Sequence, residues 1–258
     1  MARAAAAALL LSLSLSAGLG VGRGGMSWES LYRELDRLPV FVLANAQRAP
    51  LQFERDGKPL AIFYESASQA EAALLQAIEA YPSLGLRLTP TGLGNALSLA
   101  REGAKAVLVP SEDNLRQAKA MKPILPTAAA WGEPGSLPLF GCPQMRKPLE
   151  DGESGVPLFL SYADAQRALQ AAADLDDPAA KGLELECCPL VSLAEQLVAG
   201  EIEGPVQFVP SREAARYCSE LQARPSKMPD KLPKGVARRA MAFNYGENAG
   251  GASGLFPS

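Results

Sequence analysis

The chain has 258 residues, 48% of them hydrophobic, and a formal net charge of −3, so it can bury one large core or two smaller ones and is neither disordered nor fibrous in composition. The slightly acidic balance and the aromatic content of 6% argue against nucleic acid as a partner. No histidine is present, which excludes Ser-His-Asp and Cys-His catalysis and the common zinc sites. We therefore expect a protein that is not an enzyme and that uses no metal and no cofactor.

Residues 1–25 are interpreted as a signal or targeting segment. Residues 1–3 form a short basic start, residues 4–15 are apolar apart from serines, and residues 16–18 are small enough for signal-peptidase cleavage. An alanine-rich organellar presequence, or a protein that begins at Met26, remains an alternative. Beyond this segment, no stretch of the sequence is long and apolar enough to cross a membrane.

Residues 26–120 are expected to form a first α/β repeat that opens with an amphipathic helix. Ser27 caps this helix, and Leu31, Leu35 and Leu38 form its apolar stripe. Later helices are expected after Ser66, around residues 93–100 and after Ser111, where capping residues precede helical apolar spacing. Short apolar runs predict strands at residues 40–43, 58–64, 84–88 and 104–109.

Residues 121–136, rich in proline and glycine, are expected to be a linker to a second α/β repeat at residues 137–221. Strands are predicted there at residues 137–142, 156–160, 183–187 and 205–209. Ser161 is expected to cap a helix that contains Ala165 and Leu169, and Leu193 and Leu197 lie on another.

The two repeats resemble each other in sequence. Residues 38–41 (LPVF) return at 137–140 (LPLF), and residues 107–111 (VLVPS) return at 207–211 (QFVPS), with offsets of 99 and 100 residues. Matches that keep their order and spacing indicate a duplicated, domain-sized unit. We predict an α/β fold of two tandem pseudo-symmetric β-β-α-β-α-β modules, each followed by a helix, with helices packed on the sheets and a groove at the seam between them.

Residues 222–258 are expected to be a basic, Gly/Pro-rich disordered tail. Between residues 224 and 239 there are six basic residues and one acidic residue, with prolines and glycines that oppose a helix. The tail is either solvated or an arm that contacts anionic lipid headgroups or acidic partners, and peripheral membrane contact is one expectation.

Motifs for chemistry are weak. Gly92 and Gly94 precede a predicted helix, as in a phosphate-binding loop, but a helix-capping turn explains them better. All four cysteines lie in the second half without metal-ligand spacing, which favours small buried residues over a redox role. A disulfide between Cys142 and Cys187 is conceivable in an oxidising compartment.

Residues 27–221 resemble the Tic22 family, the intermembrane-space component of the chloroplast protein-import translocon, which has cyanobacterial periplasmic relatives. Three patterns support the resemblance: the segment LPVFVLAN at residues 38–45, the Ser-x-x-x-Ala-x-x-x-Leu helix starts at Ser66 and Ser161, and strands that end in Val-Pro-Ser. The resemblance implies a pseudo-symmetric α/β protein with exposed hydrophobic pockets.

The same resemblance implies a protein-import factor of the plastid envelope. Such a factor would bind apolar segments of unfolded precursor proteins in a chaperone-like manner without ATP, beside translocon subunits, soluble or peripheral in the intermembrane space, or in a periplasm-like compartment. Our candidate peptide-binding residues are the strand phenylalanines at matched places in the repeats, although such residues are commonly core: Phe41, Phe63, Phe140 and Phe159. The alternatives are an enzyme using carboxylate or lysine chemistry at the seam and a structural adaptor.

Overall fold

The computed structural model of the protein describes residues 25–55, 57–102, 105–121, 137–149, 152–173, 182–202 and 204–223. The targeting segment at 1–25 lies outside this part except for its last residue. The linker at 121–136 lies outside it except for residue 121, and the tail lies outside it from residue 224 on. None of the described helices is long and apolar enough to span a membrane.

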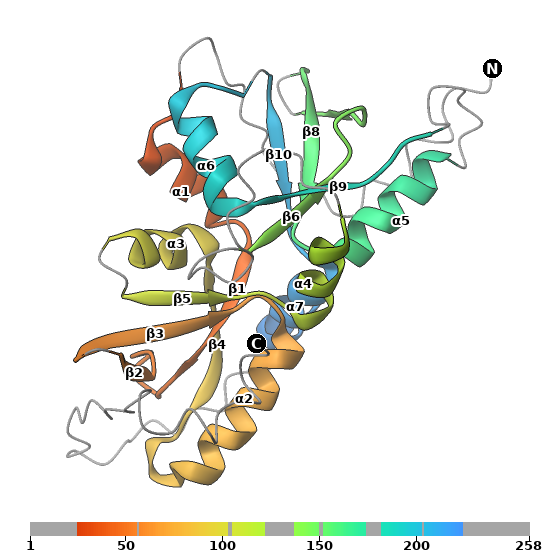
Figure 1. The fold of residues 1–258 in the computed structure, drawn as a ribbon. Helices are drawn as coiled ribbons and strands as arrows, with labels where there is room; N and C mark the ends of the chain where they lie inside the picture. Colours follow the sequence, from red (N-terminus) through yellow and green to blue (C-terminus); the bar gives the residue numbers. More distant parts are fainter. Residues whose placement is uncertain are drawn as a thin grey trace.

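The first half contains four helices and five strands among the described residues (Figure 1). In chain order they are α1 (Trp28–Leu35), β1 (Pro39–Ala44), β2 (Gln52–Arg55), β3 (Lys58–Tyr64), α2 (Ala67–Ala80), a 3-10 turn (Pro82–Leu84), β4 (Arg87–Gly92), α3 (Leu93–Arg101), β5 (Ala106–Val109) and α4 (Glu112–Ala120).

The second half repeats much of this order. Its elements are β6 (Pro138–Gly141), β7 (Lys147–Pro148), β8 (Ser154–Phe159), α5 (Tyr162–Ala173), β9 (Glu186–Pro189), α6 (Leu190–Ala199), β10 (Val206–Val209) and α7 (Arg212–Ala223). The α/β class predicted from the sequence is confirmed.

Each half forms one mainly antiparallel sheet. The order is β2-β3-β1-β4 in the first sheet, with β5 beside β3, and β10-β8-β6-β9 in the second, with β7 beside β8. The pairs β3/β5 and β8/β10 are parallel, and the other pairs are antiparallel. The two sheets therefore have the same strand order and the same sense of pairing.

Two details of the sequence prediction are wrong. Among its described residues, each half has one more strand than the expected β-β-α-β-α-β pattern, because β2 and β7 form short hairpins with β3 and β8. The strands predicted at residues 84–88 and 183–187 begin later, as β4 and β9. Gly85 and Gly182 adopt positive φ angles, of 58° and 89°, so the chain still turns where the apolar runs suggested extended structure.

Four helices begin directly after the strands of the two parallel pairs. Serine caps each of them by accepting a hydrogen bond from the backbone N–H three residues on, at 3.1–3.3 Å. These serines are Ser66, Ser111, Ser161 and Ser211. Because parallel neighbours end at the same side of a sheet, α2 and α4 start close together beside the first sheet, and α5 and α7 start close together beside the second.

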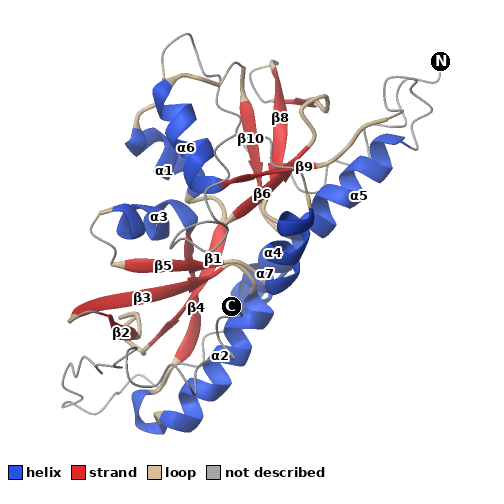
Figure 2. Cartoon of the chain, viewed as in Figure 1, coloured by secondary structure: helices blue, strands red, loops and turns tan. Residues whose placement is uncertain are grey.

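The helices that follow the last strand of each half pack on the sheet of the other half. Helix α4 contacts β6 and α5, whereas α7 contacts β1 and α2. The ring of Tyr217 on α7 meets Phe41 on β1 edge to face, with 5.2 Å between centroids. Figure 2 shows the resulting layer, in which α2, α7, α4 and α5 line one side of the strands and α1, α3 and α6 the other.

The central core belongs to both halves. It joins Leu31 and Leu35 of α1 and Leu93 and Leu97 of α3 to residues of the second sheet and α6. Gly94 permits the close approach of α3 to α1, since a Cβ atom there would overlap the carbonyl oxygen of Tyr32. The helix-capping interpretation of Gly92 and Gly94 also fits, because Asp36 accepts a 2.7 Å hydrogen bond from the N–H of Asn95 in the first turn of α3.

Candidate functional site

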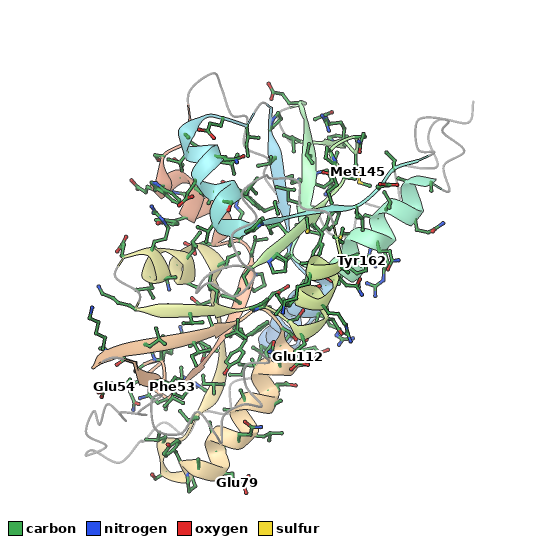
Figure 3. The ribbon with its side chains drawn as sticks, in the orientation of Figure 1. Phe53, Glu54, Glu79, Glu112, Met145 and Tyr162 are labelled. Atoms are coloured by element: carbon green, nitrogen blue, oxygen red, sulfur yellow. The ribbon has the colours of Figure 1, made fainter. Side chains whose placement is uncertain are left out.

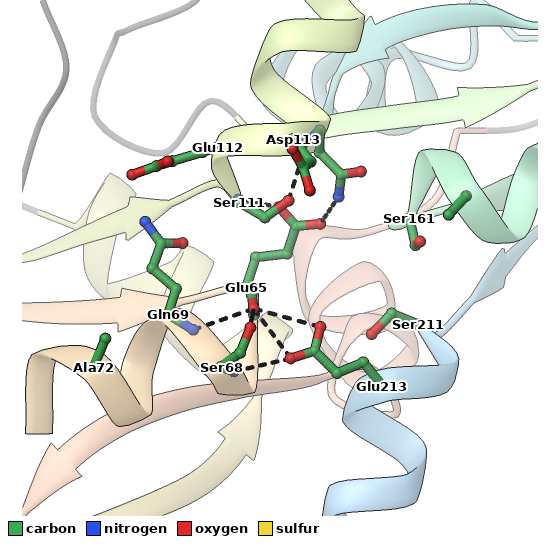
Figure 4. A pocket seen from close by; sticks show the side chains of 13 residues that line it. Glu65, Ser68, Gln69, Ala72, Ser111, Glu112, Asp113, Ser161, Ser211 and Glu213 are labelled. Atoms are coloured by element: carbon green, nitrogen blue, oxygen red, sulfur yellow. Dashed lines mark hydrogen bonds between the residues drawn. The ribbon is translucent and has the colours of Figure 1, made fainter.

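A cavity of about 500 Å³ lies at the seam, where α2, α4, α5 and α7 begin. Its walls come from Glu65, which directly follows β3, and from residues at the starts of these helices (Figure 4). The lining residues are carboxylates, hydroxyls, amides and two alanines: Glu65, Ser66, Ser68, Gln69, Ala72, Ser111, Glu112, Asp113, Asn114, Ser161, Ala163, Ser211 and Glu213. In the wider view, Glu112 lies near the middle of the molecule, whereas Glu79 marks the far end of α2 (Figure 3).

Each helix start is bonded by a side chain from a different element, so the four starts are linked in a ring. Glu213 of α7 accepts from the N–H of Ser68 in α2 at 2.8 Å. Glu65, which precedes α2, accepts from the N–H of Ser111 before α4 at 2.9 Å. The ring is completed by Asn114 of α4, which accepts from the N–H of Tyr162 in α5 at 2.9 Å, and by Asp164 of α5, which accepts from the N–H of Arg212 in α7 at 2.8 Å.

This ring explains how four helix N-termini can meet. The first backbone N–H groups of a helix have no partner within the helix, and the aligned peptide dipoles place partial positive charge there. The side chains of Glu65, Asn114, Asp164 and Glu213 accept hydrogen bonds from those groups, and the negative charges of Asp164 and Glu213 oppose the partial positive charge. The helix ends are therefore already occupied by the protein's own side chains, and the cavity is not an open site for phosphate.

Glu65 is the most buried carboxyl group of the cavity, with 4% of its surface exposed. Its carboxyl group accepts one hydrogen bond from the N–H of Ser111 and a second, short one from the side-chain amide of Asn114. Loss of hydration raises the pKa of Glu65 to about 8, the negative charge of Glu213 acts in the same direction, and the two hydrogen bonds oppose the rise. Glu65 is therefore protonated at neutral pH.

The described residues that line the seam cavity carry mostly polar side chains, whereas the resemblance implied exposed hydrophobic pockets. Four of the lining residues are acidic and five are serines. Lysine, arginine and cysteine are absent from the lining given by the described residues, and these residues contain no cluster suited to a metal ion. Chemically, the cavity can exchange protons and accept hydrogen bonds.

The four candidate phenylalanines lie in the core rather than at the seam. Phe41 contacts α7, Phe140 and Phe159 lie under α4 and α5, and Phe63 faces the central core. Their side chains are buried, so in this conformation they offer no exposed surface to a peptide. Their role in peptide binding remains a prediction.

The expected equivalence of Phe63 and Phe159 is wrong. Phe41 pairs with Tyr64 in the first sheet, and Phe140 pairs with Phe159 in the second. Tyr64 is therefore the counterpart of Phe159. Since side chains alternate between the faces of a strand, Phe63 lies on the opposite face, and a shift of one residue in the sequence alignment caused the error.

Sequence inspection missed the exposed apolar side chains of α2. Leu75 is 70% exposed and Ile78 is 40% exposed, and these two are the exposed large hydrophobic residues of the described part of the chain. The buried stripe of α2 consists of Ala70 and Ala73 with the partly buried Leu74 and Ala77. Leu75 falls outside this helical spacing, which was the available signal for an exposed position.

The cysteines are free, so Cys142 and Cys187 form no disulfide. The thiol of Cys142 donates to the side chain of Gln144 at 3.0 Å, and that of Cys187 donates to the carbonyl oxygen of Ala118 at 3.6 Å. Burial raises the pKa of Cys187 to about 11 and that of Cys188 to about 12, which leaves both as unreactive thiols in the folded protein.

The architecture has solved counterparts, although no protein-family model and no curated sequence matches the chain. The structure of Tic22 from Plasmodium falciparum is similar with a TM-score of 0.62 and 18% identity, over 75% of this chain and 98% of that one. Tic22 from Anabaena, described as a protein-transport protein, is similar with a TM-score of 0.56 and 20% identity, over 79% of this chain and 100% of that one. The chain has a Tic22-like fold. The likeness spans essentially the whole of both solved chains, so the Tic22-like fold comprises both halves and not a single module.

Proposed function

We propose that this protein is a Tic22-like protein-transport factor that binds apolar segments of unfolded precursor proteins without ATP. The observation that supports this proposal best is the likeness to two Tic22 structures over nearly their full length, one of them described as a protein-transport protein. The sequence also has no Walker loop for ATP. Translocon subunits are the further partners, and the location is the plastid intermembrane space or a periplasm-like compartment.

The outer face of α2 is the surface that suits such clients. Leu75 and Ile78 are one helical turn apart and exposed, so an apolar segment lying along the helix can contact both. Glu71 and Glu79 on the same helix are also exposed, and α2 contains no basic residue. We propose that this face receives segments in which apolar residues alternate with basic ones.

Enzymatic activity at the seam has weaker support. A buried carboxyl with a raised pKa in a cavity is a common feature of catalytic sites. Here, however, both oxygens of Glu65 already accept hydrogen bonds from Ser111 and Asn114, so neither is directed at a bound substrate. The arrangement is better explained by the joining of helices.

The proposed function can be tested by binding of the purified protein to a fluorescently labelled unfolded precursor and by suppression of the aggregation of a heated client protein. We expect Leu75→Glu/Ile78→Glu to weaken binding by about tenfold or more, because burying each large apolar side chain contributes about 1.5–3 kcal/mol. Gln76→Glu/Ala80→Glu is the matched control, since it adds the same charge at exposed positions of α2 without removing apolar surface.

If both double substitutions weaken binding of the precursor equally, the added negative charge explains the loss. That result would contradict the proposal that the outer face of α2 binds apolar segments. If the unaltered protein neither binds the precursor nor protects the client, the transport-factor proposal itself fails.

A further inference from the structure

The outer face of α2 is continuous with the seam cavity. Ser68 and Ala72 line the cavity, and Leu75 and Glu79 follow them along the helix. Because these residues are separated by four, three and four positions, their side chains lie on one side of α2. Leu75, Ile78 and Glu79 are exposed. The mostly polar lining of the cavity is therefore followed along α2 by an apolar patch and then by a carboxylate.

The carboxylates beside this patch have no cation of their own. Glu71 and Glu79 of α2 and Glu112 of α4 are exposed, and α2 contains no basic residue. Among the described residues, no ion pair involves any of these three carboxylates. An apolar patch beside unpaired carboxylates fits a segment that carries both apolar and basic side chains.

The chain itself contains a segment of this kind, in the tail beyond the residues that the structure describes. Residues 227–243 read KMPDKLPKGVARRAMAF, so apolar and basic side chains follow one another in short steps. Residues 224–239 contain six basic residues and one acidic residue. The tail therefore has the composition that we propose for clients of α2, and its charge is opposite to that of the helix.

The tail is attached near enough to reach this face within one chain. Helix α7, which ends at Ala223, begins beside α2, since Glu213 accepts a hydrogen bond from the N–H of Ser68 at 2.8 Å, and it packs on the same sheet. From the lengths of the two helices, Ala223 is at most about 35 Å from Leu75, whatever the direction of α7. About eleven extended residues cover that distance, so the chain from Lys234 onward can lie on α2.

We propose that residues 231–243 dock on the outer face of α2 of the same chain and occupy it in place of a client. Their apolar side chains cover Leu75 and Ile78, and their basic side chains face the three unpaired carboxylates. Tethering gives the tail an effective concentration on the order of 1 mM, so even a weak contact is well populated. Competition with clients rests on the proposed function, in which clients use this same face. A client then has to displace the tail, and the apolar patch stays covered while no client is bound.

Carbodiimide cross-linking of the full chain tests the docking directly, because the reagent joins carboxylates to lysine side chains without a spacer. The linked peptides are quantified by mass spectrometry. We expect the lysines of residues 227–234 to link at least about twice as often to Glu71 and Glu79 as to Glu102 and Glu195. Glu102, which follows α3, and Glu195 of α6 are also exposed, and these two helices cover the other side of the strands (Figure 2).

A pair of substitutions separates docking from mere nearness of the tail. Leu75→Ser/Ile78→Ser removes the apolar patch but leaves the tether and the carboxylates in place, and we expect links to the α2 carboxylates to fall at least about twofold. Gln76→Ser/Ala80→Ser is the matched control at exposed positions of the same helix. The docking is overturned if the two double substitutions give the same yield of links. It is also overturned if, in a mixture of 15N-labelled and unlabelled protein, links between chains are as frequent as links within a chain.

Competition with clients has its own measurement. Arg238→Glu/Arg239→Glu weakens docking by charge, and we expect the full chain with this change to bind the labelled precursor at least about twofold more tightly. Lys58→Glu/Lys105→Glu is the control, since it changes the net charge by the same amount at exposed positions of the first half. Equal precursor affinities of the two variants would overturn the competition. If the precursor binds to none of these proteins, the transport proposal fails, whereas the cross-links still decide whether the tail docks on α2.

Discussion

At the scale of single residues, the cavity shows how one buried carboxyl couples stability to pH. Folding raises the pKa of Glu65 from 4.5 to about 8, so the folded protein retains a proton that the unfolded chain releases. The contribution of Glu65 to stability is therefore complete below about pH 4.5 and is lost progressively as the pH rises toward 8.

We predict that the free energy of unfolding falls between about pH 5 and pH 8 by at most about 1.4 kcal/mol per pH unit because of Glu65. The measurement is urea unfolding at a series of pH values, for the unaltered protein and for Glu65→Gln, which cannot ionise. A slope that persists in Glu65→Gln would assign the dependence to other groups.

The residue scale also shows where sequence reasoning succeeded and where it failed. Serine caps are local features, since the serine and its N–H partner lie three residues apart, and the caps at Ser27, Ser66, Ser111 and Ser161 are confirmed. Glu65 was overlooked. Its sequence neighbours are those of an ordinary strand end, and its special environment comes from residues more than 40 positions away.

At the scale of elements, the packing of α4 and α7 on the opposite sheets is the main feature of the fold. Ala118 has no exposed surface and belongs to the cluster of Phe140 and Phe159, so α4 lies close to the second sheet through a small side chain. Ala120, two residues later, is exposed. This contrast within one helix provides a matched pair of substitutions.

We expect Ala118→Leu to lower the free energy of unfolding by about 1–3 kcal/mol, because the added side chain overpacks a filled core. Ala120→Leu should change it by less than about 0.5 kcal/mol. Thermal and urea unfolding of the two variants provide the comparison, and equal effects would show that α4 does not dock on the second sheet through Ala118.

Among the elements, the strands whose limits depend on partners were the least predictable. The runs at 84–88 and 183–187 are apolar, yet β4 and β9 extend only where β1 and β6 supply hydrogen bonds. β4 even contains Pro90, which has no N–H and is acceptable because β4 is an outer strand. Local apolar content indicates a strand, but pairing decides its ends.

At the scale of the whole molecule, the two halves depend on each other. The central core contains side chains from both sheets, and each of the helices α4 and α7 covers the sheet of the other half. The boundaries that we propose for the repeats, 26–120 and 137–221, therefore describe a duplicated pattern and not two independent folding units.

We predict that the separate fragments 26–120 and 137–221 are largely unfolded as monomers and regain structure when they are mixed, because each lacks the core surface that the other provides. Circular dichroism and size-exclusion chromatography of the single and mixed fragments test this. A cooperative unfolding transition in either fragment alone would contradict it.

The sequence by itself determined the α/β class, the positions of most helices and strands, the duplication and the resemblance to the Tic22 family. These depend on local spacing and on patterns of apolar residues, which are present in the chain before it folds. Only the tertiary structure decided that the strand phenylalanines are interior, that acidic and hydroxyl side chains line the seam cavity, that Leu75 and Ile78 are exposed and that Glu65 is enclosed where the two halves meet. Burial, hydration and pKa depend on the neighbours that distant segments provide, and the exchange of α4 and α7 between the sheets created those neighbours.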